Sequence, residues 1–217
     1  MAVGLAFSAN MIREYYTRSK LEPQVELSES LKNMAAVKNY RYSLTSEFSV
    51  DGRKEVISKV SGEKQGSNTH IKGEMVNTPV DIYFIDRTIY NFDQFSNKWL
   101  IIDTGKTNSE ELLISELKPL SNLQYETVSD VQKVGFEVLD GTDYLIVTCR
   151  PMLASNWLTT MWQDFECQIW IDYQQDLIRK AVLKATNRAV TTTRLTIKVD
   201  FKDINDSIII SSPDLSK

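Results

Sequence analysis

The sequence has few of the residues that usually build catalytic and metal sites. Histidine occurs once, at His70, and cysteine twice, at Cys149 and Cys167. These residues cannot form a usual zinc site without carboxylates, and no two of them have the short spacing of such sites. His70 shares the polar face of a strand pattern with Lys72 and Glu74, so we expect it to be solvated, and no nucleophile has a catalytic motif beside it. We therefore expect no metal, no cofactor and no enzymatic activity.

A complete phosphate-binding loop is also missing. The string Asp103–Thr107 places Gly-Lys-Thr between a predicted strand and a predicted helix, but such a loop needs another glycine five residues before Gly105. Leu100 occupies that position. We expect a turn with a solvated Lys106. Two carboxylates could act as acid and base on any fold, although no acidic pair in the sequence points to such a site.

Positive charge is neither in excess nor concentrated. The formal net charge is −4, and the lysines and arginines are scattered along the chain. A nucleic-acid-binding protein normally carries a basic face or stripe, so the composition argues against nucleic acid as a partner. Hydrophobic residues make up 42% and charged residues 25%, which is ordinary for a globular domain that buries a core.

No hydrophobic run is long enough for a membrane-spanning helix, which needs about 20 residues. Residues 2–7 are apolar, but the basic start and the cleavage site of a secretory signal are incomplete, and no cysteine follows for lipid attachment. We interpret residues 1–27 as the remnant of a signal or membrane anchor. The alternative is an amphipathic helix over residues 11–20 that packs on the domain. The first interpretation predicts an extracytoplasmic protein of the cell envelope that is attached to a membrane.

Alternation of apolar and polar residues predicts a β-rich fold. In residues 40–50 and 192–203 nearly every second residue is apolar, which gives each strand one buried and one solvated face. Asp51-Gly52 is typical of a hairpin turn, and Val56 and Val60 continue the pattern after it. Helices are predicted at 28–38, with Ser28 as the cap, and at 109–118. Further strands are predicted around 71–75 and at 80–85, 88–92, 98–103, 132–139, 143–149, 166–173, 177–186 and 208–210.

Ten or so strands in hairpin order exclude a doubly wound parallel sheet, which needs a helix between consecutive strands. An open antiparallel sheet of this size must twist and curl. No linker or change in composition divides the chain, so we expect one domain over residues 28–211 and a short tail at 212–217. The apolar face of the sheet must be covered by the few helices and by any ligand or partner that the protein holds.

Residues 152–165 carry a broad apolar stripe at helical spacing and include two of the four tryptophans, Trp157 and Trp162. One interpretation is a core helix that plugs the sheet. The other is a mobile lid over an apolar cavity, in which methionine and tryptophan side chains adapt to a flexible ligand.

The two cysteines lie in the strand patterns 143–149 and 166–173. If these strands pair through their connection, Cys149 stands opposite Cys167. Opposed Cβ atoms in antiparallel strands are about 4.5–5.5 Å apart, which is near the range of a disulfide. We therefore predict a Cys149–Cys167 disulfide, which an oxidising compartment permits. The alternative is two buried, unpaired cysteines.

The order of these elements resembles a family of bacterial extracytoplasmic lipoproteins. The segment SLKNMAAVKNYRY leads from a helix into a strand, VDG forms a turn, and a return strand follows. Later, QIWIDYQQDLIRKAVLKAT resembles the family's Trp-x-Asp hairpin, and the next strand ends in VDFKDIN. Over residues 28–211 the chain resembles the LolA/LolB and LppX/LprG-like superfamily, in particular its uncharacterised Gram-positive-type lipoproteins. The lipobox cysteine of such lipoproteins has no counterpart in this sequence.

The resemblance implies a mainly β (α+β) fold: a strongly curved antiparallel half-barrel of about ten or eleven strands, with a few helices covering its concave face. Better-known members carry lipoproteins or glycolipids in that cavity, and others bind peptides and act in envelope-stress sensing. We therefore expect a non-enzymatic envelope protein that binds a lipid, acyl chain or other apolar ligand, as a lipid or lipoprotein carrier. The alternative is a protein-interaction or sensor domain without a small ligand. The residues predicted to line the cavity are Tyr42, Leu44, Phe48, Phe84, Trp157, Leu158, Met161 and Trp162.

Overall fold

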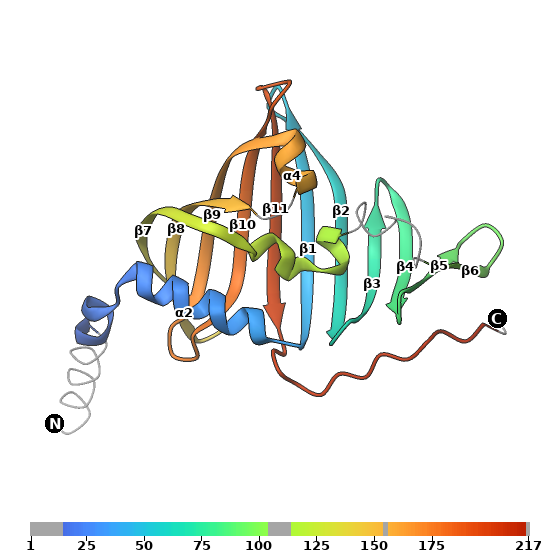
Figure 1. Ribbon diagram of the computed structural model, residues 1–217, viewed down its shortest axis with the longest axis horizontal. Helices are drawn as coiled ribbons and strands as arrows, with labels where there is room; N and C mark the ends of the chain where they lie inside the picture. The colour runs from blue at the N-terminus through green and yellow to red at the C-terminus, as the bar shows by residue number, and fades with distance from the viewer. Residues whose placement is uncertain (1–14, 104–113, 154–155, 216–217) are drawn as a thin grey trace.

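The computed structural model describes residues 15–103, 114–153 and 156–215. Its strands form one 11-stranded antiparallel sheet in the spatial order β6-β5-β4-β3-β2-β1-β11-β10-β9-β8-β7. The sheet is open, because β6 and β7 are its two edges, and it curves behind α2 and α4 (Figure 1). The predicted fold class, a mainly β antiparallel half-barrel with few helices, is confirmed.

Consecutive strands are neighbours in the sheet, except β6 and β7. The first six strands are β1 (Asn39–Val50), β2 (Arg53–Gln65), β3 (Asn68–Met75), β4 (Thr78–Ile85), β5 (Thr88–Asp93) and β6 (Lys98–Asp103). The others are β7 (Tyr125–Leu139), β8 (Thr142–Leu153), β9 (Trp162–Asp172), β10 (Leu177–Asn187) and β11 (Thr193–Lys202). Residues 15–20 are helical, and the helices that follow are α2 (Pro23–Ala36), α3 (Ile114–Leu117) and α4 (Asn156–Met161). A 3-10 turn, η2 (Pro119–Leu123), precedes β7.

The first and last strands pair with each other and join the two halves of the sheet. Tyr42 lies opposite Phe201, and Leu44 lies opposite Val199. All four side chains are buried, as the alternation in the sequence predicts, so β1 and β11 contribute their apolar faces to one core. The turn after β1 has positive φ at Asp51 and at the following glycine, which is the geometry of a tight hairpin.

Irregular pairing bends the sheet. The register shifts once between β1 and β2, twice between β9 and β10, and three times between β7 and β8. Each shift adds a bulge, which kinks a strand and increases its twist. One bulge corrects a prediction: the pairing of β2 with β1 skips Ile57, so the alternation reverses there and Val56 is 48% exposed.

The helices differ from the sequence prediction in their bounds. α2 begins at Pro23, because proline fits the first helical position, where no N–H is needed, and Ser28 therefore lies within the helix rather than at its cap. The predicted helix at 109–118 lies partly outside the described residues, and its described part contains only α3. In the part of the chain that the structure describes, no helix is long and apolar enough to cross a membrane.

The predicted strand at 208–210 does not form. Its alternation is present, since Ile208 and Ile210 are buried and Ile209 is exposed. However, the segment is extended without being assigned to the sheet, and the N–H of Ile210 donates to Oε1 of Gln65 at 2.8 Å. A side-chain partner therefore replaces the neighbouring strand that the pattern suggests.

Candidate functional site

A groove of about 550 Å³ runs between α2 and the chain that leads from η2 into β7. This volume lies within the range typical of small-molecule sites. The apolar residues that line it are Leu27, Leu31, Leu123, Tyr125, Val128 and Val131, and polar residues such as Gln24, Lys32 and Glu126 also line it. The groove therefore combines an apolar interior with polar groups, which suits a ligand that has an apolar body and a polar end.

The α2 wall of the groove follows from helical spacing. Leu27 and Leu31 are one turn apart, so they lie on the same side of α2. Leu27 and Met34 are buried in the core beneath the helix, whereas Leu31 is only partly buried and lines the groove. The end of the helix is held by Asn33, whose Nδ2 donates to the carbonyl of Asp176 in the β9–β10 turn at 3.1 Å. These contacts hold α2 against the sheet as one wall of the groove.

The sequence pattern does not predict the β7 wall, because it places the start of this strand at residue 132, whereas β7 begins at Tyr125. Tyr125, Val128 and Val131 line the groove although they are three residues apart, a spacing that no regular strand places on one face. Register shifts in the β7–β8 pairing at 125–127 and at 129–132 supply the extra residues. Only the pairing with β8 reveals this face, because the local sequence shows no alternation of period two.

Tyr125 joins the groove to the two cysteines. Its hydroxyl donates to Sγ of Cys167 at 3.2 Å. Burial, the largest cause, and the neighbouring Cys167 raise the pKa of Tyr125 well above its ordinary value, so the phenol stays protonated. Cys149 and Cys167 lie directly opposite each other in the β8–β9 pairing, which confirms the predicted register. Both are buried free thiols in this structure, and the disulfide itself stays a prediction.

The residues that the sequence predicted as a cavity lie elsewhere on the concave side. Tyr42, Leu44, Phe84, Leu158 and Trp162 are buried in the hydrophobic core, and none of them lines the groove. The ring of Phe48 lies 5.4 Å from that of Trp162, while Met161 is 47% exposed. Trp157 belongs to α4. The structure brings Phe48, Leu158 and Trp162 into one core cluster, and their role in binding stays a prediction.

The segment 152–165 is not one helix. α4 covers only residues 156–161, because Met152 and Leu153 belong to β8, and β9 begins at Trp162. Leu153 pairs with Tyr125, and Trp162 pairs with Asn187. Strand pairing on both sides therefore overrides the helical spacing of the apolar residues, so they do not form one continuous helix. The lid over an apolar cavity stays a prediction.

Hydrogen bonds attach α3 to β1–β3. The hydroxyl of Tyr42 donates to the carbonyl of Glu116. The hydroxyl of Thr69 donates to the carbonyl of Leu117 at 3.1 Å, and Nζ of Lys64 donates to Oγ1 of Thr69 at 2.8 Å. Burial is the main cause that raises the pKa of the Glu116 carboxyl above its ordinary value. This helix is thus held both by these polar contacts and by Leu117, which is buried in the core.

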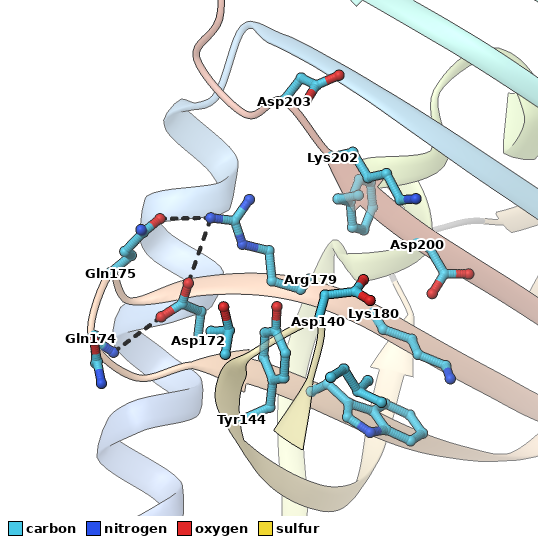
Figure 2. Close-up of a pocket in the computed structure, with 14 residues that line it drawn as sticks. Asp140, Tyr144, Asp172, Gln174, Gln175, Arg179, Lys180, Asp200, Lys202 and Asp203 are labelled. Atoms are coloured by element: carbon cyan, nitrogen blue, oxygen red, sulfur yellow. Dashed lines mark hydrogen bonds and ion pairs between the residues drawn. The ribbon is translucent and has the colours of Figure 1, made fainter. Parts of the chain in front are cut away.

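A second cavity, of about 470 Å³, lies on the opposite side of the sheet from the buried face and includes the Trp-x-Asp hairpin (Figure 2). Arg179 and Asp172 form an ion pair between two of its charged residues. Arg179 lies 3.5 Å from Asp172 and donates to Oε1 of Gln175 at 2.6 Å, and Asp172 also accepts from the N–H of Gln174. Lys180 lies 4.5 Å from the ring centre of Trp170. We interpret these residues as the polar framework of the β9–β10 hairpin.

His70 is not solvated as predicted. It is half-buried, stacks on Tyr83 with 3.8 Å between ring centres, and its Nε2 lies 2.8 Å from Oδ1 of Asp81. The stacking follows from the β3–β4 pairing, in which Tyr83 lies opposite His70. Across the described residues, no group of three or more histidines, cysteines and carboxylates is placed to hold a metal ion.

Comparison with solved structures shows which fold this arrangement represents. The lipoprotein LppX from Mycobacterium tuberculosis is similar with a TM-score of 0.61 and 14% sequence identity, over 86% of this chain and 97% of that one. LprF from Mycobacterium bovis is similar with a TM-score of 0.60 and 12% identity, over 88% and 96%. No family model and no curated protein sequence matches the chain. The predicted LppX-like fold is confirmed, and at these identities the likeness concerns the fold alone.

Proposed function

We propose that this protein binds the apolar chain of a lipid in the groove between α2 and β7, as a non-enzymatic protein of the cell envelope outside the cytoplasm. The observation that carries the proposal is the groove itself, whose volume and aliphatic lining residues fit an acyl chain. The LppX-like fold supports the location in the cell envelope, since LppX is a lipoprotein. We further propose that the protein is attached to a membrane and that it transfers the bound lipid.

The physical gain comes from removing methylene groups from water. Each buried methylene contributes about 0.8 kcal/mol, so a chain that places several methylenes between Leu31 and Val131 gains useful affinity without any specific hydrogen bond. Lys32 and Glu126 line the same groove, where the polar end of the lipid stays hydrated. This arrangement favours a groove that selects lipids by their shape and hydrophobicity.

The second part of the proposal is that a long lipid chain extends from the groove to the residues that the sequence predicts to line a cavity, around α4. Tyr125, in the groove, lies opposite Leu153, which precedes α4 by only a few residues. A long chain that continues past Tyr125 therefore approaches α4 and the Phe48–Trp162 contact. Trp162 fluorescence should then change when such a lipid binds.

The test uses pyrene-labelled palmitic acid and a charge placed in the groove. We expect saturable binding by the unmodified protein and an affinity at least about tenfold lower for Leu31→Glu, because a buried carboxylate opposes an apolar chain. Val25→Glu places the same charge on an exposed part of the same helix and should change affinity by less than about twofold. Absence of saturable binding, or equal losses in both variants, would contradict the proposal.

A second candidate function is recognition of a protein partner through the β6 edge. Leu100, Ile101 and Ile102 are all exposed on this edge strand, and Phe95 in the turn before it is 97% exposed. Exposed apolar residues on an unpaired edge favour the addition of a strand from another chain. This function does not require the groove, so variants of the two regions separate the two candidates.

A further inference from the structure

Cys149 and Cys167 form a cross-strand pair with the backbone arrangement of a disulfide. They are the last pair of the β8–β9 ladder and lie directly opposite each other. Directly opposed residues in antiparallel strands have Cα atoms about 4.5–5.5 Å apart, within the range that disulfides span. Both side chains are buried on the same face. We infer that these two thiols are the site of an intramolecular disulfide.

The position of the pair gives the bond a mechanical role. β8 runs on to Leu153 and there pairs only with β7, while β9 begins at Trp162 and there pairs with β10. The two strands therefore separate directly beyond the cysteines, and α4 lies in the connection between them. A covalent bond at this point closes the base of the α4 connection and restricts the unfolded chain, which stabilises the folded state.

The bond also lies next to the groove. The Tyr125 hydroxyl donates to Cys167, and Tyr125 lines the groove. Oxidation would fix the position of the Cys167 sulfur, which is the hydrogen-bond acceptor of the Tyr125 hydroxyl. The disulfide is independent of the proposed function, because its formation depends on the cysteine geometry and on an oxidant and not on any lipid.

Formation of the Cys149–Cys167 disulfide requires an oxidant. We propose that this oxidant is the disulfide of a thiol–disulfide oxidoreductase. The thiolate of Cys149 attacks one sulfur of that disulfide, which forms a mixed disulfide and releases one thiolate. Cys167 loses its proton and its sulfur attacks Cys149, which releases the second thiolate. The protein loses two electrons and two protons, and the oxidant becomes a dithiol.

The decisive experiment is refolding of the reduced full chain in a mixture of oxidised and reduced glutathione, because both thiols are accessible before the strands close. We expect no free thiol in the subsequently denatured protein, a mass 2 Da lower than that of the reduced chain, and a proteolytic peptide pair linked through Cys149 and Cys167. Reduction should then raise the unfolding equilibrium constant by roughly 100-fold.

Cys149→Ser/Cys167→Ser is the matched control. Its unfolding should be unaffected by reductant, which separates loss of the disulfide from any other effect of the reducing buffer. Two free thiols per chain after refolding, glutathione adducts in place of the internal bond, or disulfide-linked dimers would each overturn the inference. None of these outcomes depends on lipid binding, so the result is distinct from that of the groove experiment.

Discussion

The two halves of the sheet are covered by helices of different character. On the β7 side, α2 is 14 residues long and buries Leu27 and Met34 in the core. On the β2–β3 side, α3 has four residues, buries Leu117 in the core and accepts hydrogen bonds at the carbonyls of Glu116 and Leu117. Apolar contact contributes in proportion to the area buried, whereas a hydrogen bond contributes little net free energy but fixes position. We infer that α2, which buries more apolar surface, supplies more of the stability, and that α3 is held by Leu117 and positioned by its hydrogen bonds.

The two edge strands of the sheet, β7 and β6, differ in how well they are protected against pairing with another chain. β7 has register shifts along its length, and Lys133 on it donates to the carbonyl of Arg18, in a helical segment before α2. Bulges and charged residues are the usual means by which an edge strand avoids pairing with other chains. β6 pairs with β5 without a register shift and exposes three consecutive apolar residues, 100–102. β7 is therefore a protected edge that borders the groove, and β6 is an edge suited to contact.

The largest expected effect tests the contrast between the helices. Leu27→Ala should lower the free energy of unfolding by about 2–5 kcal/mol, because it removes buried methyl groups and leaves a cavity under α2. Tyr42→Phe, which removes the hydroxyl that holds α3, should cost only about 0.5–1.5 kcal/mol. Urea unfolding at neutral pH measures both values.

Val25→Ala on the exposed side of α2 controls for helix propensity and should change the free energy of unfolding by less than about 0.5 kcal/mol. The contrast between the two helices would be wrong if Tyr42→Phe destabilised the protein as much as Leu27→Ala.

Period-two alternation predicted most of the sheet correctly, because a strand with one buried face leaves that signature in its own sequence. The faces of β1 and β11, the turn at Asp51-Gly52 and the register that opposes Cys149 to Cys167 all follow from local pattern and chain connection. Such features depend on residues close in sequence, so a single chain contains the information.

The groove could not be predicted in the same way. Tyr125, Val128 and Val131 share a face only because the β7–β8 ladder is bulged, and a bulge is decided by the partner strand. The helical spacing within 152–165 was likewise overridden by pairing with β7 and β10. Leu153, Leu158 and Trp162 are core residues, whereas Met152 and Met161 are exposed, because the backbone that carries them depends on contacts far apart in the sequence.

A smaller effect concerns the pH dependence of the α3 contact. Burial raises the pKa of Glu116 above its ordinary value of 4.5, so the folded state holds its proton more tightly than the unfolded state. The stability from this group is complete below about pH 4.5 and is lost as the pH rises through the folded-state pKa. Glu116→Gln removes the ionisation. We therefore expect its free energy of unfolding, relative to the unmodified protein, to increase between acidic and neutral pH, as measured by urea unfolding across that range.

Glu74→Gln, at an exposed position on β3, is the control and should give a stability–pH curve parallel to that of the unmodified protein. Parallel curves for Glu116→Gln as well would mean that the carboxyl is not held neutral, and that α3 is attached independently of pH.

Substitutions on the two edge strands are expected to have the smallest effect on stability. Their effect is measured instead as association between protein molecules. Ile101 on β6 and Val134 on β7 are both 56% exposed, so Ile101→Lys and Val134→Lys place the same charge at equally accessible positions. Each should change the free energy of unfolding by less than about 0.5 kcal/mol. Ile101→Lys should slow concentration-dependent aggregation in light scattering severalfold, because a lysine opposes pairing at an edge strand, whereas Val134→Lys should have little effect, since Val134 lies where the β7–β8 register shifts. Equal protection by both variants, or by neither, would show that the two edges do not differ and would remove the support for a partner at β6.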